Sequence, residues 1–265
     1  MPKTIAIVII RPEGVEVARK LHQVYPQWDF WMPKSAGPAG NEQGYETRFN
    51  VWLQNNFQYY KGFVCFMAAG IVVRALGSIA HDKHSDPGVV VCDEFGRQAI
   101  SLLGGHEGGA NLLAYNVANA LGANPVISTG TESMKRYVLG VGCRKNAEYG
   151  ALEQLMARVL AENHVTPDMI RVVTTIDVKK EEPCILNLVK NYHWPLLIFT
   201  REEILASGIQ VARSAFVEET LGVPGVCEPT ALMASHYGEL VVQKTTDQGC
   251  AIALVRETDL QKRRP

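Results

Sequence analysis

The sequence lacks an excess of charge of either sign, because 26 Lys and Arg residues face 27 Asp and Glu residues and leave a net charge of −1. Such a chain has no electrostatic footprint for nucleic acid or an anionic membrane, so we expect neither as a partner. No apolar stretch approaches the ~20 residues that a membrane-spanning helix needs. The apolar run 5–10 meets Arg11 and Pro12 at once, without a small-residue cleavage site, and indicates a first strand. We therefore expect a cytoplasmic protein.

Cysteine is present, but not in the spacing typical of a small disulfide-linked fold or of a metal site. The six cysteines include no C-x-x-C and no tight pair, which argues against a disulfide framework and a structural zinc site. Most fall inside apolar runs, so we expect buried thiols in a reducing compartment. They are Cys65, Cys92, Cys143, Cys184, Cys227 and Cys250.

Three common motifs are also absent. The stretch Gly104–Gly109 is Gly-Gly-His-Glu-Gly-Gly, whereas a G-x-G-x-x-G fingerprint needs glycine at position 106, and no Gly-Lys-Ser/Thr of a P-loop follows. No Gly-x-Ser-x-Gly elbow supports a serine hydrolase. A generic nucleotide-binding α/β protein is therefore kept only as a third alternative.

What the sequence does contain is an alternation of strand-type and helix-type segments. Its 265 residues are 47% hydrophobic, enough for a real core in one large or two small domains. Continuous β-branched runs indicate strands buried on both faces, so we predict an α/β fold with two Rossmann-like three-layer domains and mainly parallel sheets. The polar stretch 129–136 separates an N-terminal domain at 1–130 from a C-terminal domain at 137–260.

The individual elements follow from the same patterns. Strands are predicted at 5–10, 27–32, 63–69, 89–92, 99–103, 125–128, 137–141, 172–176, 196–199, 240–243 and 251–255. Helices are predicted at 15–25, 45–60, 71–79, 110–121, 147–163, 183–192, 201–206 and 229–235, with Gly122 as a C-cap. We expect a loop at 33–44, a turn at 142–144 and a hairpin joining 89–92 to 99–103.

The densest stretch of functional groups is 70–111, where three loops lie, each expected at the end of a strand: the Gly70 turn, 81–86 and 104–111. Ligands of open α/β sheets bind beyond the carboxyl ends of strands, so this stretch predicts an anion-binding site. The glycines of the third loop would let the backbone approach a ligand, and the helix from Ala110 would direct free amides at it. A tight strand–helix turn is the alternative explanation.

Charged side chains of this stretch have two interpretations each. Lys83 and Arg74 would pair with substrate carboxylates or be ordinary surface charges. Asp93 and Glu94, at the hairpin tip, are more typical of turn residues than of catalysts. The spacing of the other polar groups is too loose for a metal site, so we expect no protein-bound metal. These groups are His81, Asp82, His84, Asp86 and His106.

Four segments run in one unbroken order: Ala69–Arg74, Asp82–Pro87, Val89–Gly96 and Ile100–Asn111. They include Asp-Lys-His-Ser-Asp-Pro and Ile-Ser-Leu-Leu-Gly-Gly-His-Glu-Gly-Gly-Ala-Asn. In these segments the chain resembles the cobalt-precorrin-5A hydrolase (CbiG) family of cobalamin biosynthesis. The second half is similar to that family's C-terminal domain at Gly140–Arg144, Lys179–Pro183 and Gly222–Pro229.

One departure from the family concerns the region between the two halves. Many members carry a middle segment there, whereas Ser128–Thr131 runs almost directly into Tyr137, so the chain resembles a compact form without that segment. CobE, a stand-alone version of the C-terminal domain, belongs to the aerobic pathway. The N-terminal half therefore favours the anaerobic hydrolase.

The resemblance implies that a lactone of a ring-contracted cobalt corrinoid is opened and that acetaldehyde is released, giving cobalt-precorrin-5B. Cobalt is carried by the substrate, so we expect no cofactor. We hypothesise that His106 is the general base and that the amides of Gly108 and Gly109 stabilise an oxyanion. Asp82 or Asp86 would orient His106 or water.

A wider set of residues is expected to bind the substrate. Gly142 and Arg144 follow a predicted strand and precede a helix, where anions are favoured, although a structural turn explains them equally. We expect the C-terminal half to close the other wall of a cleft around the macrocycle. The substrate-binding candidates are Gly70, Arg74, Lys83, Gly104, Gly105, Gly108, Gly109, Asn111, Gly142 and Arg144.

Two further alternatives stay open. A non-catalytic corrinoid carrier of the same pathway would use the same glycine-rich loops and basic residues, and only turnover distinguishes it from an enzyme. A homodimer is neither required nor excluded by the sequence.

Overall fold

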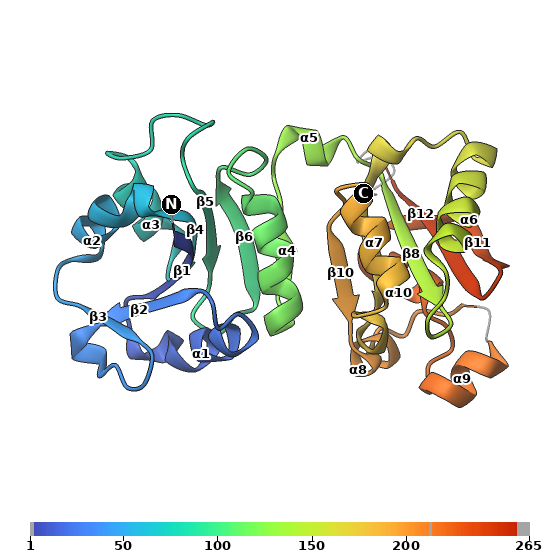
Figure 1. Cartoon of the computed structure of the whole chain (residues 1–265), viewed down its shortest axis with the longest axis horizontal. Helices are drawn as coiled ribbons and strands as arrows, with labels where there is room; N and C mark the ends of the chain where they lie inside the picture. The colour runs from blue at the N-terminus through green and yellow to red at the C-terminus, as the bar shows by residue number, and fades with distance from the viewer. Residues whose placement is uncertain (1–2, 212–213, 259–265) are drawn as a thin grey trace, which may run out of the picture. The chain divides into compact units, whose positions relative to one another are not determined.

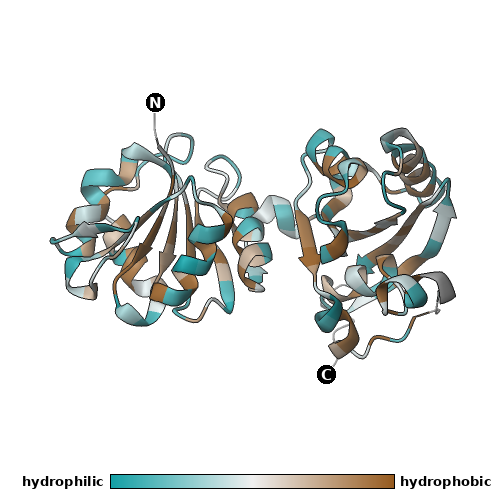
Figure 2. Ribbon diagram, turned by 60° about the horizontal axis from the view of Figure 1, so that its bottom comes forward, coloured by the Kyte–Doolittle hydropathy of each residue, from teal (hydrophilic) through white to brown (hydrophobic). Residues whose placement is uncertain are grey.

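The computed structural model describes residues 3–211 and 214–258, and it divides between Thr129 and Gly130 into two compact units, unit 1 and unit 2. Each unit is a β-sheet with helices on both faces (Figure 1), which confirms the predicted α/β fold with two Rossmann-like three-layer domains. The sheet strands carry the most apolar segments of both units (Figure 2). Among the described residues, no helix combines the length and apolar character that crossing a membrane requires.

Unit 1 contains a seven-stranded sheet in the order β3-β2-β1-β4-β5-β6-β7. Its strands are β1 (Lys3–Ile9), β2 (Asp29–Pro33), β3 (Gln43–Tyr45), β4 (Tyr60–Phe66), β5 (Gly88–Cys92), β6 (Gln98–Leu103) and β7 (Asn124–Val126). Its helices are α1 (Val15–Val24), α2 (Phe49–Asn56), α3 (Ala69–Leu76) and α4 (Ala110–Leu121), with 3-10 turns at Pro12–Gly14, Lys34–Ala36 and Phe57–Tyr59. Neighbouring strands are parallel except β5 and β6, which form the predicted hairpin.

Strand β1 is buried on both faces because its alternate residues pack against different helices. Ala6 and Val8 join a hydrophobic cluster with residues of α2 and α3. Ile7 and Ile9 are fully buried on the other face, where α1 contacts β1 and α4. This arrangement explains why the segment is continuously apolar rather than alternating.

Unit 2 contains a five-stranded sheet in the order β10-β9-β8-β12-β11. Its strands are β8 (Tyr137–Cys143), β9 (Ile170–Ile176), β10 (Leu196–Phe199), β11 (Gly238–Asp247) and β12 (Cys250–Glu257). Its helices are α5 (Gly130–Ser133), α6 (Tyr149–Glu162), α7 (Pro183–Asn191), α8 (Arg201–Ala206), α9 (Ala215–Leu221) and α10 (Cys227–Met233), with 3-10 turns at Pro167–Met169 and Asp177–Lys179. Strands β8, β9 and β10 are parallel, and β12 and β11 add an antiparallel hairpin.

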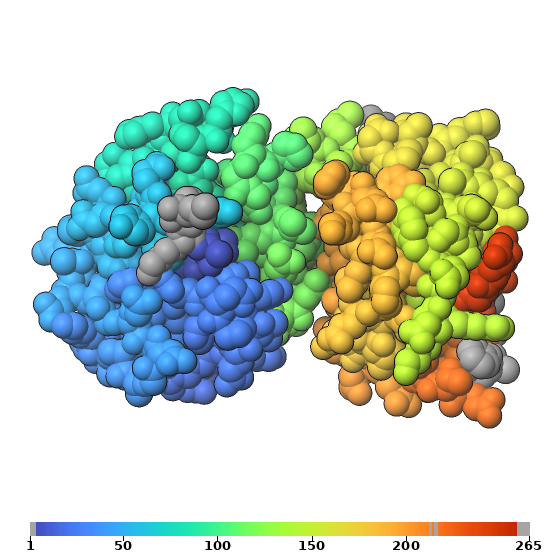
Figure 3. All heavy atoms as spheres, in the orientation of Figure 1, coloured from blue at the N-terminus to red at the C-terminus, as the bar shows by residue number. Residues whose placement is uncertain are grey.

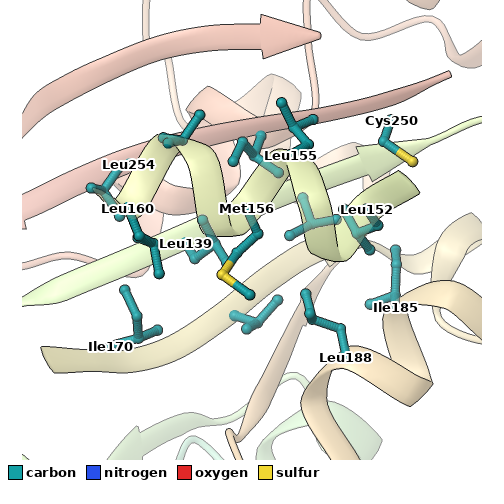
Figure 4. Packing of buried hydrophobic residues seen from close by; sticks show 14 of the residues in the cluster. Leu139, Leu152, Leu155, Met156, Leu160, Ile170, Ile185, Leu188, Cys250 and Leu254 are labelled. Carbon is teal, nitrogen blue, oxygen red and sulfur yellow. The ribbon is translucent and has the colours of Figure 1, made fainter. Parts of the chain in front are cut away.

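The two faces of this second sheet are covered differently. Helices α6 and α7 bury one face in a cluster that includes Leu155, Ile185 and Leu254 (Figure 4). Helix α10 approaches the other face so closely that a Cβ at Gly140 would lie 1.8 Å from the carbonyl oxygen of Cys227. Glycine is therefore required at position 140.

Four local predictions are corrected. The expected loop 33–44 contains a 3-10 turn and the start of β3, a three-residue edge strand that exists only by pairing with Trp31–Pro33. Gly142 and Cys143 belong to β8 rather than to a turn, because Ala251 and Cys250 of β12 pair with them. The polar stretch 129–136 includes the short helix α5, and α9 lies where no helix is predicted.

Candidate functional site

The direction of β6 decides where the three candidate loops lie. Loop 81–87 precedes β5, and loop 104–109 follows β6, which is antiparallel to β5 with Val89 opposite Leu103. Both loops therefore lie at the edge where β4 and β5 begin, which we call the amino edge (Figure 1). The Gly70 turn follows β4 and lies at the opposite, carboxyl edge. The prediction that all three loops share the carboxyl edge is wrong.

Segments 81–88 and 104–109, hereafter the loop pair, touch backbone to backbone. A Cβ at Gly88 would lie 2.4 Å from the carbonyl oxygen of Gly108, and one at Gly108 would lie 3.0 Å from that of Asp86. Gly104 has a φ of +64° and passes close to Pro87. The glycines are therefore needed for packing, as the tight-turn alternative proposes.

The amides at the start of α4 are largely occupied, which corrects the predicted oxyanion site. Gly109 donates to the carbonyl of His106 at 3.3 Å, Ala110 to that of Gly104 at 3.1 Å and Asn111 to that of Gly105 at 2.9 Å. The amide of Gly108 has no acceptor among the described residues. The amides of His106, Glu107 and Leu112 have no acceptor there either, so the donors that remain for an anion lie mainly on the loop.

Asn111 is a buried positioning residue and not a surface contact. Its Oδ1 accepts a hydrogen bond from Ser101 Oγ at 2.8 Å, and its Nδ2 donates to Thr129 Oγ1 at 3.0 Å. A Cβ at Gly105 would lie 2.4 Å from Cγ2 of the same Thr129. This network fixes the first turn of α4 against the end of unit 1.

The two aspartates of loop 81–87 hold the loop itself. Asp86 is buried, and its Oδ2 accepts from the amides of His81 at 2.8 Å and Asp82 at 3.0 Å. Asp82 Oδ1 accepts from the amide of His84 at 3.0 Å, and this bond lowers the pKa of the Asp82 carboxyl. No hydrogen bond joins either carboxylate to His106 within the described chain.

His106, Lys83 and Glu107 are among the groups that the loop pair presents to solvent. All three are exposed, and the imidazole of His106 has no partner among the residues described. Lys83 Nζ lies 3.9 Å from Glu107 Oε1, so one loop reaches across to the other. Figure 3 shows the turquoise segment that contains loop 81–87 at the surface of unit 1. The loop pair thus combines an imidazole, an ammonium group and a free amide.

The carboxyl edge carries two cavities that the sequence reasoning missed. One of about 350 Å³ lies where β1 and β4 end, the point at which α1 and α3 leave on opposite faces. A second of about 480 Å³ lies beside it and shares Ile10. Their polar lining comes from Arg11, Asp93, Glu94, Arg97 and Gln98 in the first and Lys34, Ser35, Glu46, Thr47 and Arg48 in the second. Applying the carboxyl-end rule to β1 would have indicated Arg11.

Gly70 and Arg74 lie next to the first cavity, one helical turn apart on α3. A Cβ at Gly70 would lie 3.6 Å from Nη1 of Arg74, so the guanidinium lies over the first turn of the helix. Asp93 closes the hairpin: its carboxylate accepts from the amides of Phe95 at 3.0 Å and Gln98 at 3.0 Å. Burial would raise the pKa of Asp93, but these amides and Arg97 lower it. The turn interpretation of Asp93 is confirmed.

The candidates in unit 2 are split between core and surface. Gly142 is buried inside β8, whereas Arg144 is exposed, donates its amide to Gly249 at 2.8 Å and packs its side chain along that glycine. Glu228 is buried, and its Oε1 accepts from the amide of Lys244 at 2.8 Å. In the part of the chain that the structure describes, no three His, Cys, Asp or Glu side chains are arranged to hold a metal ion.

Comparison with known proteins gives consistent matches in both units. Residues 51–132 match the family model described as "Cobalamin synthesis G N-terminal", and residues 137–255 match "Cobalamin synthesis G C-terminus". The chain is 26% identical to the cobalt-precorrin-5A hydrolase of Salmonella typhimurium over 348 positions, covering 96% of this chain and 97% of that protein. It is 25% identical to the cobalt-precorrin-5A hydrolase of Priestia megaterium, covering 94% of each.

CobE of a Sinorhizobium species is 30% identical over 126 residues, which cover 47% of this chain and 82% of CobE. The Salmonella alignment is 83 positions longer than the 265 residues here, so at least that many residues of the relative have no counterpart in this compact form. Both halves of the chain match one family in the same order, and the chain belongs to the cobalamin synthesis G (CbiG) family.

Proposed function

We propose that this chain is a cobalt-precorrin-5A hydrolase. The observation that carries the proposal is the alignment with the Salmonella hydrolase along 96% of this chain and 97% of that enzyme. CobE corresponds to less than half of this chain, so its likeness accounts for unit 2 alone. The presence of unit 1 supports the enzyme over a stand-alone binding protein.

The proposed reaction is hydrolytic. Water adds to the lactone carbonyl of a ring-contracted cobalt corrinoid, and the lactone C–O bond breaks to leave a carboxylate and an alkoxide. The alkoxide becomes the carbonyl of acetaldehyde as its C–C bond to the macrocycle breaks, and the electron pair of that bond passes into the conjugated ring, which takes up a proton to give cobalt-precorrin-5B. The cobalt ion enters and leaves with the substrate. The protein must therefore activate water, stabilise an oxyanion and hold a macrocycle that carries many carboxylates.

The loop pair supplies groups that suit these demands. His106 is an exposed imidazole, the side-chain type that most often serves as a general base. The Gly108 amide, two residues away and without a protein acceptor in the described region, is the candidate oxyanion donor. Lys83 reaches this loop through its contact with Glu107, and would bind a peripheral carboxylate.

The decisive experiment is an anaerobic incubation of the purified chain with cobalt-precorrin-5A. Catalytic release of acetaldehyde, together with a corrinoid product that has lost the two-carbon unit, is the expected result. A spectral shift that saturates at one equivalent without acetaldehyde would overturn the enzyme and identify a corrinoid carrier. If the chain neither binds nor converts the corrinoid, its function lies outside corrinoid chemistry. A screen for nucleotide binding would then be the next step.

A further inference from the structure

Three cysteines that lie far apart in the sequence meet at one end of the sheet of unit 2. Cys143 is the last residue of β8, and Cys250, the first of β12, pairs directly with it across the antiparallel ladder. Cys184 is the second residue of α7, and its Sγ lies 3.5 Å from that of Cys143. Cys250 and Cys184 are 1% exposed, whereas Cys143 is partly exposed.

The surroundings of Cys184 favour a thiolate. The thiol of Cys143 lowers the pKa of Cys184, and the amides of Cys184 and Ile185 in the first turn of α7 act in the same direction. The same sulfur–sulfur contact raises the pKa of Cys143, so the two sulfurs share one proton. Burial raises the pKa of Cys250 to about 11, so it stays a thiol.

We propose that Cys143 and Cys184 are a dithiol modification site, which a peroxide oxidises to an intramolecular disulfide. The partly exposed Cys143 is the sulfur that peroxide reaches. A metal site is not favoured, since the described residues hold no group of three suitable ligands here. The inference stands on the contact between the two sulfurs and does not depend on the proposed hydrolase activity.

The oxidation proceeds in two balanced steps. Cys143 first passes its proton to the Cys184 thiolate; its own sulfur then attacks one oxygen of hydrogen peroxide, an S–O bond forms, the O–O bond breaks, and hydroxide leaves and takes up a proton to give water. The Cys184 thiolate then attacks the Cys143 sulfur, the S–S bond forms, the S–O bond breaks and a second water leaves. Two thiols lose two electrons and two protons, and one peroxide is reduced to two waters.

The two elements are already held together. Glu182 Oε2 accepts from the amide of Asn146 at 3.1 Å, which ties the segment after β8 to the residue before α7. Closing the contact of 3.5 Å to an S–S bond of about 2.05 Å brings the sulfurs nearer by roughly 1.5 Å. The oxidised chain would fix the end of β8, and with it the exposed Arg144, covalently to α7.

The test uses the full chain after reduction and removal of the reductant. With about a tenfold excess of hydrogen peroxide, we expect the free thiols counted in denaturant to fall from six to four and to return with dithiothreitol. Peptide mapping should show one cross-linked pair that contains Cys143 and Cys184. A cross-link to Cys250, or six thiols after treatment, would overturn the proposal, and so would a sulfinic acid at Cys143.

Variants provide the controls. Cys143→Ser and Cys184→Ser should each abolish the cross-link, while Cys250→Ser should keep it with a rate within about twofold of the parent chain. Cys65→Ser in unit 1 is a control for a buried cysteine outside the cluster. Thermal melting of the reduced proteins checks folding, and the peptide map of the parent chain decides the question even if a variant does not fold.

Discussion

The backbone of Gly88 packs directly on the backbone of Gly108: a Cβ at Gly88 would lie 2.4 Å from the Gly108 carbonyl oxygen and 2.9 Å from the Ala110 amide nitrogen. The start of β5 and the start of α4 are thereby held at a fixed separation. His106 lies on the short loop between Gly104 and Gly108, both of which make such contacts. The position of the candidate base is thus set by glycine packing rather than by hydrogen bonds of its own side chain.

Gly88→Ala should destabilise unit 1. The added methyl group overlaps backbone atoms that cannot move aside, so we expect the free energy of unfolding to fall by about 1–3 kcal/mol. Urea unfolding followed by tryptophan fluorescence measures this, since Trp28, Trp31 and Trp52 all lie in unit 1. Gly70→Ala is the control, because its Cβ would meet only the flexible end of Arg74 at 3.6 Å. Equal stability of the two variants would contradict the packing argument.

His106→Ala should lower kcat on cobalt-precorrin-5A by at least about a hundredfold, because general base catalysis contributes 10²–10⁴ in rate. Its circular dichroism should match the parent, since the side chain is exposed. His84→Ala, an exposed histidine in the other loop of the pair, is the matched control and should retain activity within about twofold. A turnover number of His106→Ala near that of the parent would remove His106 from the mechanism.

Lys83→Ala and Arg74→Ala should show which edge of the sheet of unit 1 binds the substrate. If the corrinoid binds at the loop pair, Lys83→Ala raises KM by about tenfold, since a charge-assisted contact is worth roughly 1.5 kcal/mol. Arg74→Ala, at the carboxyl edge, should then leave KM within about twofold. Steady-state measurement of KM for both variants distinguishes binding at the loop pair from binding at the carboxyl edge. The reverse pattern of KM changes would indicate that the substrate binds in the cavities lined by Arg11 and Arg48.

Glu182→Gln should destabilise the chain in a pH-dependent way. Lys179, 2.8 Å from Oε1, lowers the pKa of Glu182 from its ordinary value of 4.5, and burial only partly opposes this. The folded state therefore gains stability from Glu182 above about pH 4.5, and loses it as the pH falls through the lowered pKa. Calorimetry should show a lower Tm for the variant at pH 7, and the difference should shrink as the pH falls below 4.5.

Glu181→Gln is the control for that pair, because Glu181 is exposed and forms no ion pair within the described chain. Its Tm should follow the parent at every pH. A Tm difference for Glu182→Gln that persists unchanged at pH 3 would mean that Glu182 stabilises the chain through packing and not through its charge.

Sequence patterns predict the helices and turns of this chain well where neighbouring residues determine the structure. Helix α4 begins and ends at the predicted residues, and Gly122 adopts the left-handed conformation of a C-cap with φ of +72°. The hairpin of β5 and β6 is also predicted, and it already implies that the loop after β6 leaves at the edge where β5 begins. The carboxyl ends of antiparallel strands lie at opposite edges of a sheet, so the loop after β6 lies opposite the carboxyl edge of β4 and β5, where it is predicted.

Other features could not be predicted because they depend on distant partners. Gly142 is in a strand because Ala251 pairs with it, and the 108 residues between them carry no local sign of that pairing. The amides of Ala110 and Asn111 are occupied because the loop turns back on Gly104 and Gly105. The glycines indicate that the backbone of this loop can adopt many conformations, but they do not indicate which carbonyl groups its amides will contact.

The order of strands in unit 2 has a consequence for how the chain is made. Strand β12 lies between β8 and β11 in the sheet, although it is the last strand along the chain. During synthesis, β8 can pair with β9 on one edge, but its other edge stays unpaired until residues 250–257 have emerged, whereas every strand of unit 1 is complete by Val126. Unit 1 is expected to fold first while unit 2 still exposes an open strand edge, which makes that interval the one most prone to misassembly.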